Sequence, residues 1–136
     1  MIEINNKTRT KINLRLVKII TENFFVYYKI KNKNVSIVFV GDIVMTRLNK
    51  KYRCKNYPTD ILSFQDDEGD LGEIIIDYAQ IKRQAFKFSK SIKAELIFIL
   101  VHGLLHLLGY EDESEKGRMN MENLGKEFIL QLKIND

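Results

Sequence analysis

Apolar positions in the first half of the chain switch between the spacing of strands and the spacing of helices. Residues Ile2–Asn6 alternate apolar and polar side chains, which predicts a short strand. From about residue 10 to residue 28, apolar side chains recur every three or four positions and predict a helix. Val35–Val40 is apolar and rich in β-branched residues, so we expect a buried strand there. Asp42 is then suited to cap a helix over about residues 43–52.

Two further strands are predicted after the only proline of the chain, Pro58. Ile61–Phe64 and Leu71–Asp77 both have the composition of strands. The acidic stretch Gln65–Asp70 between them has the character of a turn. The two strands are therefore expected to pair as a hairpin.

The remainder of the chain is predicted to be helical. A first helix begins at residue 77 or 78 and runs to about residue 88. Ser91 can cap a second helix that ends at Leu108, and Ser114 can cap a third that ends near Lys133. Strands and helices partly alternate and partly segregate, which predicts an α+β fold with a small mixed sheet of about four strands. The second helix is so apolar that we expect it to be the central helix, packed on the sheet.

Length and composition limit the possible classes of protein. The 136 residues suit one domain, residues 1–136, with one core. No apolar stretch reaches the roughly 18–20 residues that cross a bilayer, and the N-terminus lacks the pattern of a signal peptide. The single cysteine, Cys54, excludes an internal disulfide, which fits a cytoplasmic location. We interpret its thiol as a bystander, because no histidine is near it in the sequence.

Charge is distributed unevenly, although the net charge is only +4. Residues 1–58 contain 13 Lys and Arg against 3 Asp and Glu, whereas residues 59–136 contain 9 against 15. A basic surface can attract a polyanion, and an acidic region can hold a cation. A solvated, lysine-rich surface would have the same composition, and the chain has no RGG run, RNP-like aromatic motif or helix-turn-helix signature that would favour nucleic acid.

The only two histidines of the chain define a candidate metal site. His102 and His106 are four residues apart in a helix-forming segment, so both imidazoles lie on one helical face. Gly109 can end the helix in a left-handed conformation, after which the chain can bring Asp112 to the same metal. Three protein ligands with an open fourth position are typical of a catalytic metal site.

Other interpretations of this pattern remain open. Histidines on an apolar face are often hydrogen-bonded core residues, but a buried pair needs partners for four ring nitrogens, and a metal satisfies two of them. Nitrogen and oxygen ligands together favour zinc, with manganese, nickel or iron as alternatives. The metalloprotease motif has a glutamate after its first histidine, and this chain has Gly103 there, so another residue or the metal-bound hydroxide must act as base. Three acidic residues compete with Asp112 as third ligand: Glu111, Glu113 and Glu115.

Four runs of the sequence resemble the YbeY family of bacterial rRNA maturation factors. The run HGLLHLLGYED at residues 102–112 is similar to the family pattern HGxLHLxGYDH. The runs LNKKYR at 48–53 and PTDILSF at 58–64 resemble the family's LNxxYR and PTDVLSF, and LGEI at 71–74 resembles LGDI. The resemblance covers roughly residues 40–125, with the blocks in the same order.

This resemblance implies an α+β fold and a metal-dependent, single-strand endoribonuclease that holds zinc with three histidines. Two of these histidines match His102 and His106, whereas the third falls at Asp112 and the preceding family aspartate falls at Glu111. An aspartate oxygen can bind zinc, but its negative charge should weaken the Lewis acidity of the metal. The family arginine that is implicated in activity falls at Arg53, whose guanidinium can hold a phosphate in bidentate fashion.

We therefore predict an endoribonuclease of rRNA maturation and ribosome quality control that binds one zinc ion, RNA and the small ribosomal subunit. Its catalytic residues would be Arg53, His102 and His106. A peptidase or amidase with the same ligands, and a non-catalytic ribosome assembly factor, are the alternatives, and the oligomeric state is left open. Basic residues of the N-terminal half would attract the RNA backbone: Arg9, Lys11, Arg15, Lys50, Lys51 and Lys55.

Several residues near these motifs also have simpler interpretations. Without the resemblance, Arg53 is one more surface cation. Thr59 and Asp60 fit turn chemistry before a strand as well as they fit a function. A solvated hairpin tip is a better interpretation than a second cation site for the acidic residues Asp66, Asp67, Glu68 and Asp70.

Overall fold

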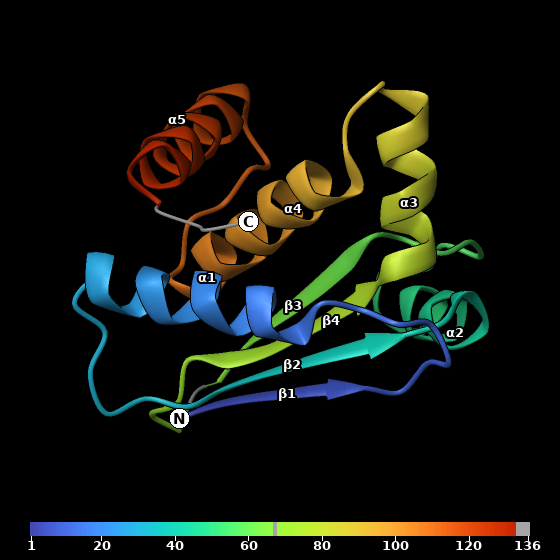
Figure 1. The fold of residues 1–136 in the computed structure, drawn as a ribbon, viewed down its shortest axis with the longest axis horizontal. Helices are drawn as coiled ribbons and strands as arrows, with labels where there is room; N and C mark the ends of the chain where they lie inside the picture. The colour runs from blue at the N-terminus through green and yellow to red at the C-terminus, as the bar shows by residue number, and fades with distance from the viewer. Residues whose placement is uncertain (67, 133–136) are drawn as a thin grey trace.

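The computed structural model describes residues 1–66 and 68–132, and within them five helices surround a four-stranded sheet (Figure 1). This arrangement confirms the predicted α+β fold. The strands are β1 (Ile2–Asn6), β2 (Val35–Val40), β3 (Ile61–Gln65) and β4 (Gly72–Asp77). The helices are α1 (Leu14–Tyr27), α2 (Asp42–Arg53), α3 (Tyr78–Lys87), α4 (Ile92–Leu107) and α5 (Glu115–Gln131).

The sheet is mixed and has the strand order β1-β2-β4-β3. Strands β1 and β4 both run parallel to β2, and β3 runs antiparallel to β4. The predicted hairpin of β3 and β4 is therefore confirmed. In the centre of the sheet, Ile37 is paired with Ile4 on one side and with Ile74 on the other. Strand β3 is thus an edge strand of the sheet, and it packs against α4.

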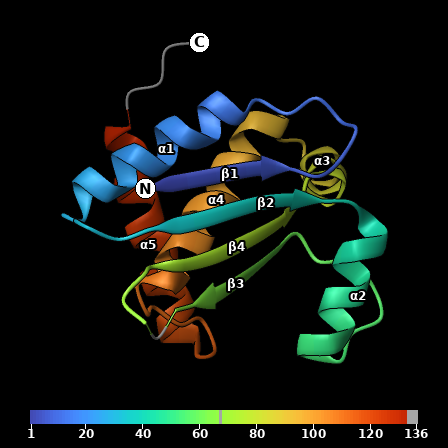
Figure 2. The same ribbon diagram turned by 90° about the horizontal axis from the view of Figure 1, so that it is seen from below.

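Helix α4 is the central helix of the fold, as its apolar sequence predicted. It contacts β3 and β4 below and α1, α3 and α5 around it. Figure 1 shows α4 between the sheet and α5, and Figure 2 shows α1, α4 and α5 behind the same face of the sheet. Burial on nearly all sides explains its all-round apolar composition. Among the described ranges 1–66 and 68–132, no helix combines the length and apolar character that crossing a membrane requires.

Helix α2 covers part of the opposite face of the sheet. Met45 is fully buried there and packs in one cluster with Val40, Leu62 and Ile75. This cluster fixes α2 against β3 and β4 and so determines where its last turn lies. The end of α2 is thereby placed beside the β3 edge (Figure 2).

Helix starts are set by capping side chains, with two departures from prediction. Ser91 and Ser114 cap α4 and α5 as predicted, each accepting a backbone N–H at 3.0 Å. Helix α1 begins at Leu14 and not near residue 10, because the Asn13 side chain caps it by accepting the Leu16 N–H at 3.1 Å.

The prediction that Asp42 is an N-cap was wrong. Gly41 occupies the cap position, and Asp42 is the first helical residue, with its carboxylate bound to Arg83 at 2.7 Å. An ion pair with α3 thus takes the place of a hydrogen bond to the helix's own backbone. Helix α5 ends at Gln131, and Lys133, the predicted end, lies outside the described residues.

Candidate metal centre

The two histidines lie one turn apart on α4, and their rings converge. The Nε2 atoms of His102 and His106 are 3.2 Å apart, and the ring planes are almost perpendicular, at 81°. The α4 backbone that carries them is held by its contacts with the sheet and with three helices. Packing of a central helix therefore fixes the position of both imidazoles.

The turn after α4 brings a carboxylate to the same point. Gly109 has a φ of 101°, a left-handed conformation that glycine adopts without strain, and it reverses the chain as predicted. Asp112 Oδ2 then lies 3.1 Å from His102 Nε2 and 3.5 Å from His106 Nε2. These side chains are 21%, 28% and 40% exposed for His102, His106 and Asp112, so the cluster is open to solvent on one side.

The donor set fits one divalent cation. His106 Nδ1 lies 3.0 Å from the Tyr110 carbonyl oxygen, and a proton donated along this contact leaves Nε2 bare for a metal. A tetrahedral zinc site with bonds of about 2.0–2.1 Å separates its ligand atoms by roughly 3.3–3.4 Å. The three separations of 3.1, 3.2 and 3.5 Å are close to this value.

The electrostatics of the cluster favour an ionised carboxylate. Partial burial raises the pKa of Asp112, but the hydrogen bond to His102 and the charges of His106 and His102 outweigh it, so the net pKa is lowered. An ionised carboxylate is the form that binds a metal.

A cavity of about 610 Å³ opens over the three side chains. The end of α2 contributes Arg53, and the loop after it contributes Lys55, so two cations face the same space as the histidines. This loop is anchored by Asn49, whose buried side chain donates to the Tyr57 carbonyl oxygen at 2.8 Å. The remaining lining residues come from β3, α4 and the residue before β3: Asp60, Ile61, Ser63, Phe98 and Ile99.

The other predicted candidates lie apart from this cluster. Within residues 1–66 and 68–132, His102, His106 and Asp112 form the one group of side chains with the geometry to hold a metal ion, and Glu111, Glu113 and Glu115 do not join it. Cys54 is exposed and belongs to no such group. The acidic residues Asp66, Glu68 and Asp70 line a different hollow, and Asp67 lies outside the described residues.

Sequence reasoning did not single out Ser63 or Phe98 as part of the site. Ser63 donates to the Gly103 carbonyl oxygen at 3.3 Å, and the Phe98 ring is stacked on the His102 ring at 6.3 Å. A signal for Ser63 exists in the sequence, because strand alternation puts it on the α4-facing side of β3 with Ile61. A polar residue on a strand face that packs against an apolar helix indicates a candidate functional site. No comparable signal distinguishes Phe98 from the other apolar residues of α4.

Comparison with known proteins gives consistent matches over most of the chain. The model of the family described as Endoribonuclease YbeY matches residues 2–133. Endoribonuclease YbeY of Phytoplasma mali is 36% identical over 139 residues, covering 98% of this chain and 92% of the relative. Endoribonuclease YbeY of Thermodesulfovibrio yellowstonii is 44% identical over 106 residues, covering 73% of this chain and 67% of the relative. The solution structure of TM1509 from Thermotoga maritima aligns with a TM-score of 0.70 at 25% identity, covering 97% of this chain and 89% of that one.

Proposed function

Because the chain belongs to the endoribonuclease YbeY family, we propose that it cleaves single-stranded RNA with one divalent metal ion held by His102, His106 and Asp112. As a member of this family the chain is a nuclease that acts on phosphodiester bonds. We further propose that it works in rRNA maturation and ribosome quality control, in the cytoplasm and on the small ribosomal subunit.

The observation that carries the proposal is the convergence of three metal-binding atoms beneath a cavity with cationic walls. The His102 and His106 Nε2 atoms and Asp112 Oδ2 lie 3.1–3.5 Å apart, and Arg53 and Lys55 line the space above them. A phosphodiester is an anion, so this cavity offers both the charge to bind it and the ligands to activate its cleavage.

Zinc is the cation that we expect in this site. Two imidazole nitrogens and one carboxylate oxygen suit zinc, and other divalent metals can also use this set. When bound, such a cation supplies Lewis acidity toward a phosphoryl oxygen and lowers the pKa of coordinated water. The ligand set is one negative charge richer than three histidines, which weakens both effects.

The protein's own residues would hold the substrate in place. Arg53 presents a guanidinium that can bind two phosphate oxygens at once, and Lys55 adds a second positive charge to the same cavity. The proposal assigns Arg53 to the scissile phosphate for this reason.

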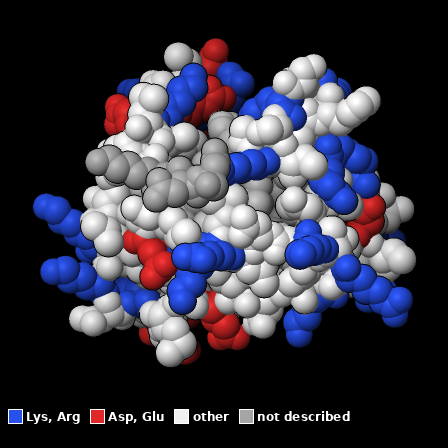
Figure 3. Space-filling model, viewed as in Figure 1, with Lys and Arg blue, Asp and Glu red and all other residues white. Residues whose placement is uncertain are grey.

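Basic side chains outside the cavity would attract the flanking RNA backbone. Figure 3 shows lysine and arginine side chains spread over the face seen in Figure 1, several of them on the side where α3 lies. The exposed basic residues at the end of α2 and just after it are Lys50, Lys51, Arg53 and Lys55. Together with the predicted Arg9, Lys11 and Arg15, they supply a charge-based, sequence-independent attraction.

The test is a cleavage assay on a labelled single-stranded RNA with zinc-loaded protein. We expect cleavage by the wild type, loss of cleavage with a chelator and recovery on adding zinc. His106→Ala should reduce the rate by at least about 100-fold, because a ligand of the catalytic metal is lost. Cleavage that is unchanged by the chelator and by His106→Ala would contradict the proposal.

Metal analysis of matched variants separates the ligand assignment from the activity. Asp112→Ala should lower the metal content of the purified protein, whereas Glu113→Ala, in the same turn but outside the cluster, should not. Equal metal content in Asp112→Ala and wild type would exclude Asp112 as an essential ligand. In parallel, peptide cleavage without RNA cleavage would favour a peptidase, and small-subunit binding without any cleavage would favour an assembly factor.

A further inference from the structure

Helix α4 cannot carry a catalytic base beside its first histidine, because β3 fills the space. A Cβ atom at Gly103 would lie 2.5 Å from Ile61 Cδ1 and 3.1 Å from Ser63 Oγ. Any side chain at this position would therefore collide with the Ile61 and Ser63 side chains of the edge strand unless these shift. A side chain that takes a proton from the attacking nucleophile would have to come from another element that reaches the cavity.

Asp60 is a carboxylate in the right place. It lies directly before β3 and lines the same cavity as His102 and His106. Among the described residues that line this cavity, the only other carboxylate is Asp112, which the proposed metal would occupy. Asp60 is thus the one lining carboxylate that stays available to accept a proton.

The Asp60 carboxylate is held at both oxygens. Its Oδ2 accepts a hydrogen bond from Gln84 Nε2 at 3.1 Å, and its Oδ1 accepts one from Thr59 Oγ1 at 3.3 Å. The Asp60 carbonyl oxygen also accepts the Asp77 N–H at 2.9 Å, which fixes its backbone at the start of the hairpin. A simple turn before β3 would not require the hydrogen bond that Gln84 of α3 donates to Asp60.

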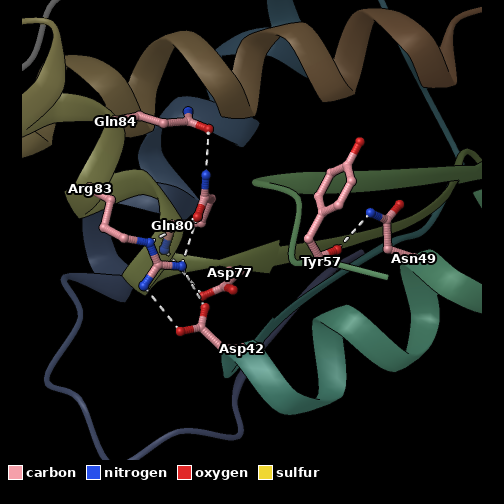
Figure 4. A network of polar contacts seen from close by, with 7 residues as sticks. All are labelled: Asp42, Asn49, Tyr57, Asp77, Gln80, Arg83 and Gln84. Carbon is pink, nitrogen blue, oxygen red and sulfur yellow. Dashed lines mark hydrogen bonds and ion pairs between the residues drawn. The ribbon is translucent and has the colours of Figure 1, made fainter. Parts of the chain in front are cut away.

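Gln84 in turn is anchored by hydrogen bonds to residues of α3 and α4. Its Nε2 also donates to Glu95 Oε2 at 3.0 Å, and its Oε1 accepts from Gln80 Nε2 at 3.3 Å, the contact that Figure 4 shows between two residues of α3. Glu95 is only 4% exposed and is paired with Lys90 Nζ at 2.8 Å. The amide of Gln84 therefore bridges a buried, charge-balanced carboxylate on α4 and the carboxylate at the cavity wall.

We propose that Asp60 is the catalytic proton acceptor of the cleavage reaction and that Gln84 is the residue that positions it. This inference rests on the proposed function. In the step, the attacking water gives a proton to the Asp60 carboxylate while its oxygen forms a bond to phosphorus. The bond from phosphorus to the leaving ester oxygen breaks with its electron pair, and that oxygen takes up a proton from solvent.

The experiment compares zinc-loaded wild type with Asp60→Asn, Asp60→Ala and Gln84→Met. Asp66→Asn is the matched control, since it removes an exposed carboxylate from the other end of the same hairpin strand. Each variant is measured for metal content, for RNA affinity after metal removal, for thermal midpoint, and for kcat and KM. We expect metal content and RNA affinity within about threefold of wild type in every variant.

Asp60→Asn should lose roughly 100-fold or more in kcat with little change in KM, as expected when a proton acceptor is removed. Gln84→Met should lose less, about tenfold, again in kcat. Added formate should restore part of the activity of Asp60→Ala and none of the activity of His106→Ala, because a small carboxylate can replace a missing proton acceptor but not a metal ligand.

Three results would overturn this assignment. Asp60→Asn that cleaves within threefold of an active wild type excludes the role in proton transfer. Loss of metal from Asp60→Asn makes the residue a part of the metal site instead. A wild type that cleaves no RNA at all removes the proposed function, and this assignment falls with it.

Discussion

Asp112 stands where the family pattern has a histidine, and its carboxylate lies within 3.5 Å of both imidazoles. Relative to that pattern, a charged side chain replaces a neutral one in the proposed metal site. Its pKa is lowered by His102 and His106 despite partial burial, so the charge is present near neutral pH. We therefore expect the site to bind a metal ion and to make it a weaker Lewis acid than a site of three histidines would.

Asp112→His should therefore increase the RNA cleavage rate several-fold at equal metal content. A neutral imidazole leaves more positive charge on the metal, which strengthens its effect on the phosphate. Single-turnover kinetics with zinc-loaded protein measures the change, and Glu113→His, beside the cluster, is the control. A rate that stays equal or falls, with the metal retained, would show that ligand charge does not limit this site.

At the scale of the secondary-structure elements, the site depends on how closely β3 approaches α4. The approach is possible because Gly103 has no side chain: Ile61 and Ser63 occupy the space that a Cβ would need. Gly125 on α5 differs, since a Cβ atom added there would lie 3.7 and 4.0 Å from its nearest neighbours, which is ordinary van der Waals contact. Close packing therefore explains the glycine at position 103 but not the one at position 125.

Gly103→Ala should destabilise the protein by about 1–3 kcal/mol, because the added methyl group overpacks the contact between α4 and β3. Gly125→Ala should be neutral or stabilising by up to about 1 kcal/mol, since alanine favours helix and finds space there. Urea unfolding of both variants gives the comparison. Equal stability of the two would mean that β3 moves aside freely.

A second contact between elements joins α2, β4 and α3. Asp42, the first residue of α2, is bound by Arg83 of α3, and this bond lowers the pKa of Asp42 to about 2 (Figure 4). Asp77, at the end of β4, is fully buried, and one of its oxygens has no hydrogen-bond donor. Burial, followed by the close and negatively charged Asp42 carboxylate, raises the pKa of Asp77 to about 7.

Stability should consequently fall as the pH rises from about 4 to about 7. Protonated Asp77 is favoured in the folded state, so its contribution is present below the ordinary aspartate pKa and is lost as the pH passes the raised one. Asp77→Asn keeps an acceptor for the Gln80 N–H and should remove this dependence, being more stable than wild type at pH 8. Unfolding free energies at pH 4.5, 6 and 8 measure it. Parallel pH profiles of both proteins would contradict the assignment.

At the scale of the whole molecule, the fold brings a basic segment and an acidic segment of the chain together. The basic end of α2 and the acidic turn after α4 are distant in sequence, yet Arg53 and Asp112 line one cavity. The uneven distribution of charge along the chain thus becomes a cationic wall beside the candidate metal cluster. Attraction of RNA to this surface is electrostatic and should be sensitive to salt.

RNA affinity should fall roughly tenfold or more between 50 and 200 mM salt if about three phosphates are contacted. Arg53→Ala should reduce the slope of log affinity against log salt by about 0.7, the value for one contact with a single strand. Lys126→Ala, an exposed change on α5, should leave the slope unchanged. Fluorescence anisotropy with protein freed of metal provides the data, and a flat salt response would exclude a charge-based RNA surface.

Local sequence determined the elements and the convergence of the metal-binding side chains. The spacing of His102 and His106 and the left-handed turn at Gly109 act over one or two helical turns, where the geometry of the backbone leaves little choice. Strand alternation and capping serines determined the element order in the same way. The wrong cap at Asp42 shows the limit, because its partner Arg83 is far along the chain.

Tertiary structure alone decided what surrounds those ligands. That β3 excludes a side chain at Gly103, that Asp60 reaches the cavity and that Gln84 holds it depend on contacts between residues 11 to 42 positions apart. Such contacts follow from how the sheet and α4 pack together, and no short stretch of sequence records that packing. The chemistry of the ligands is local, whereas the choice of a proton acceptor is a property of the fold.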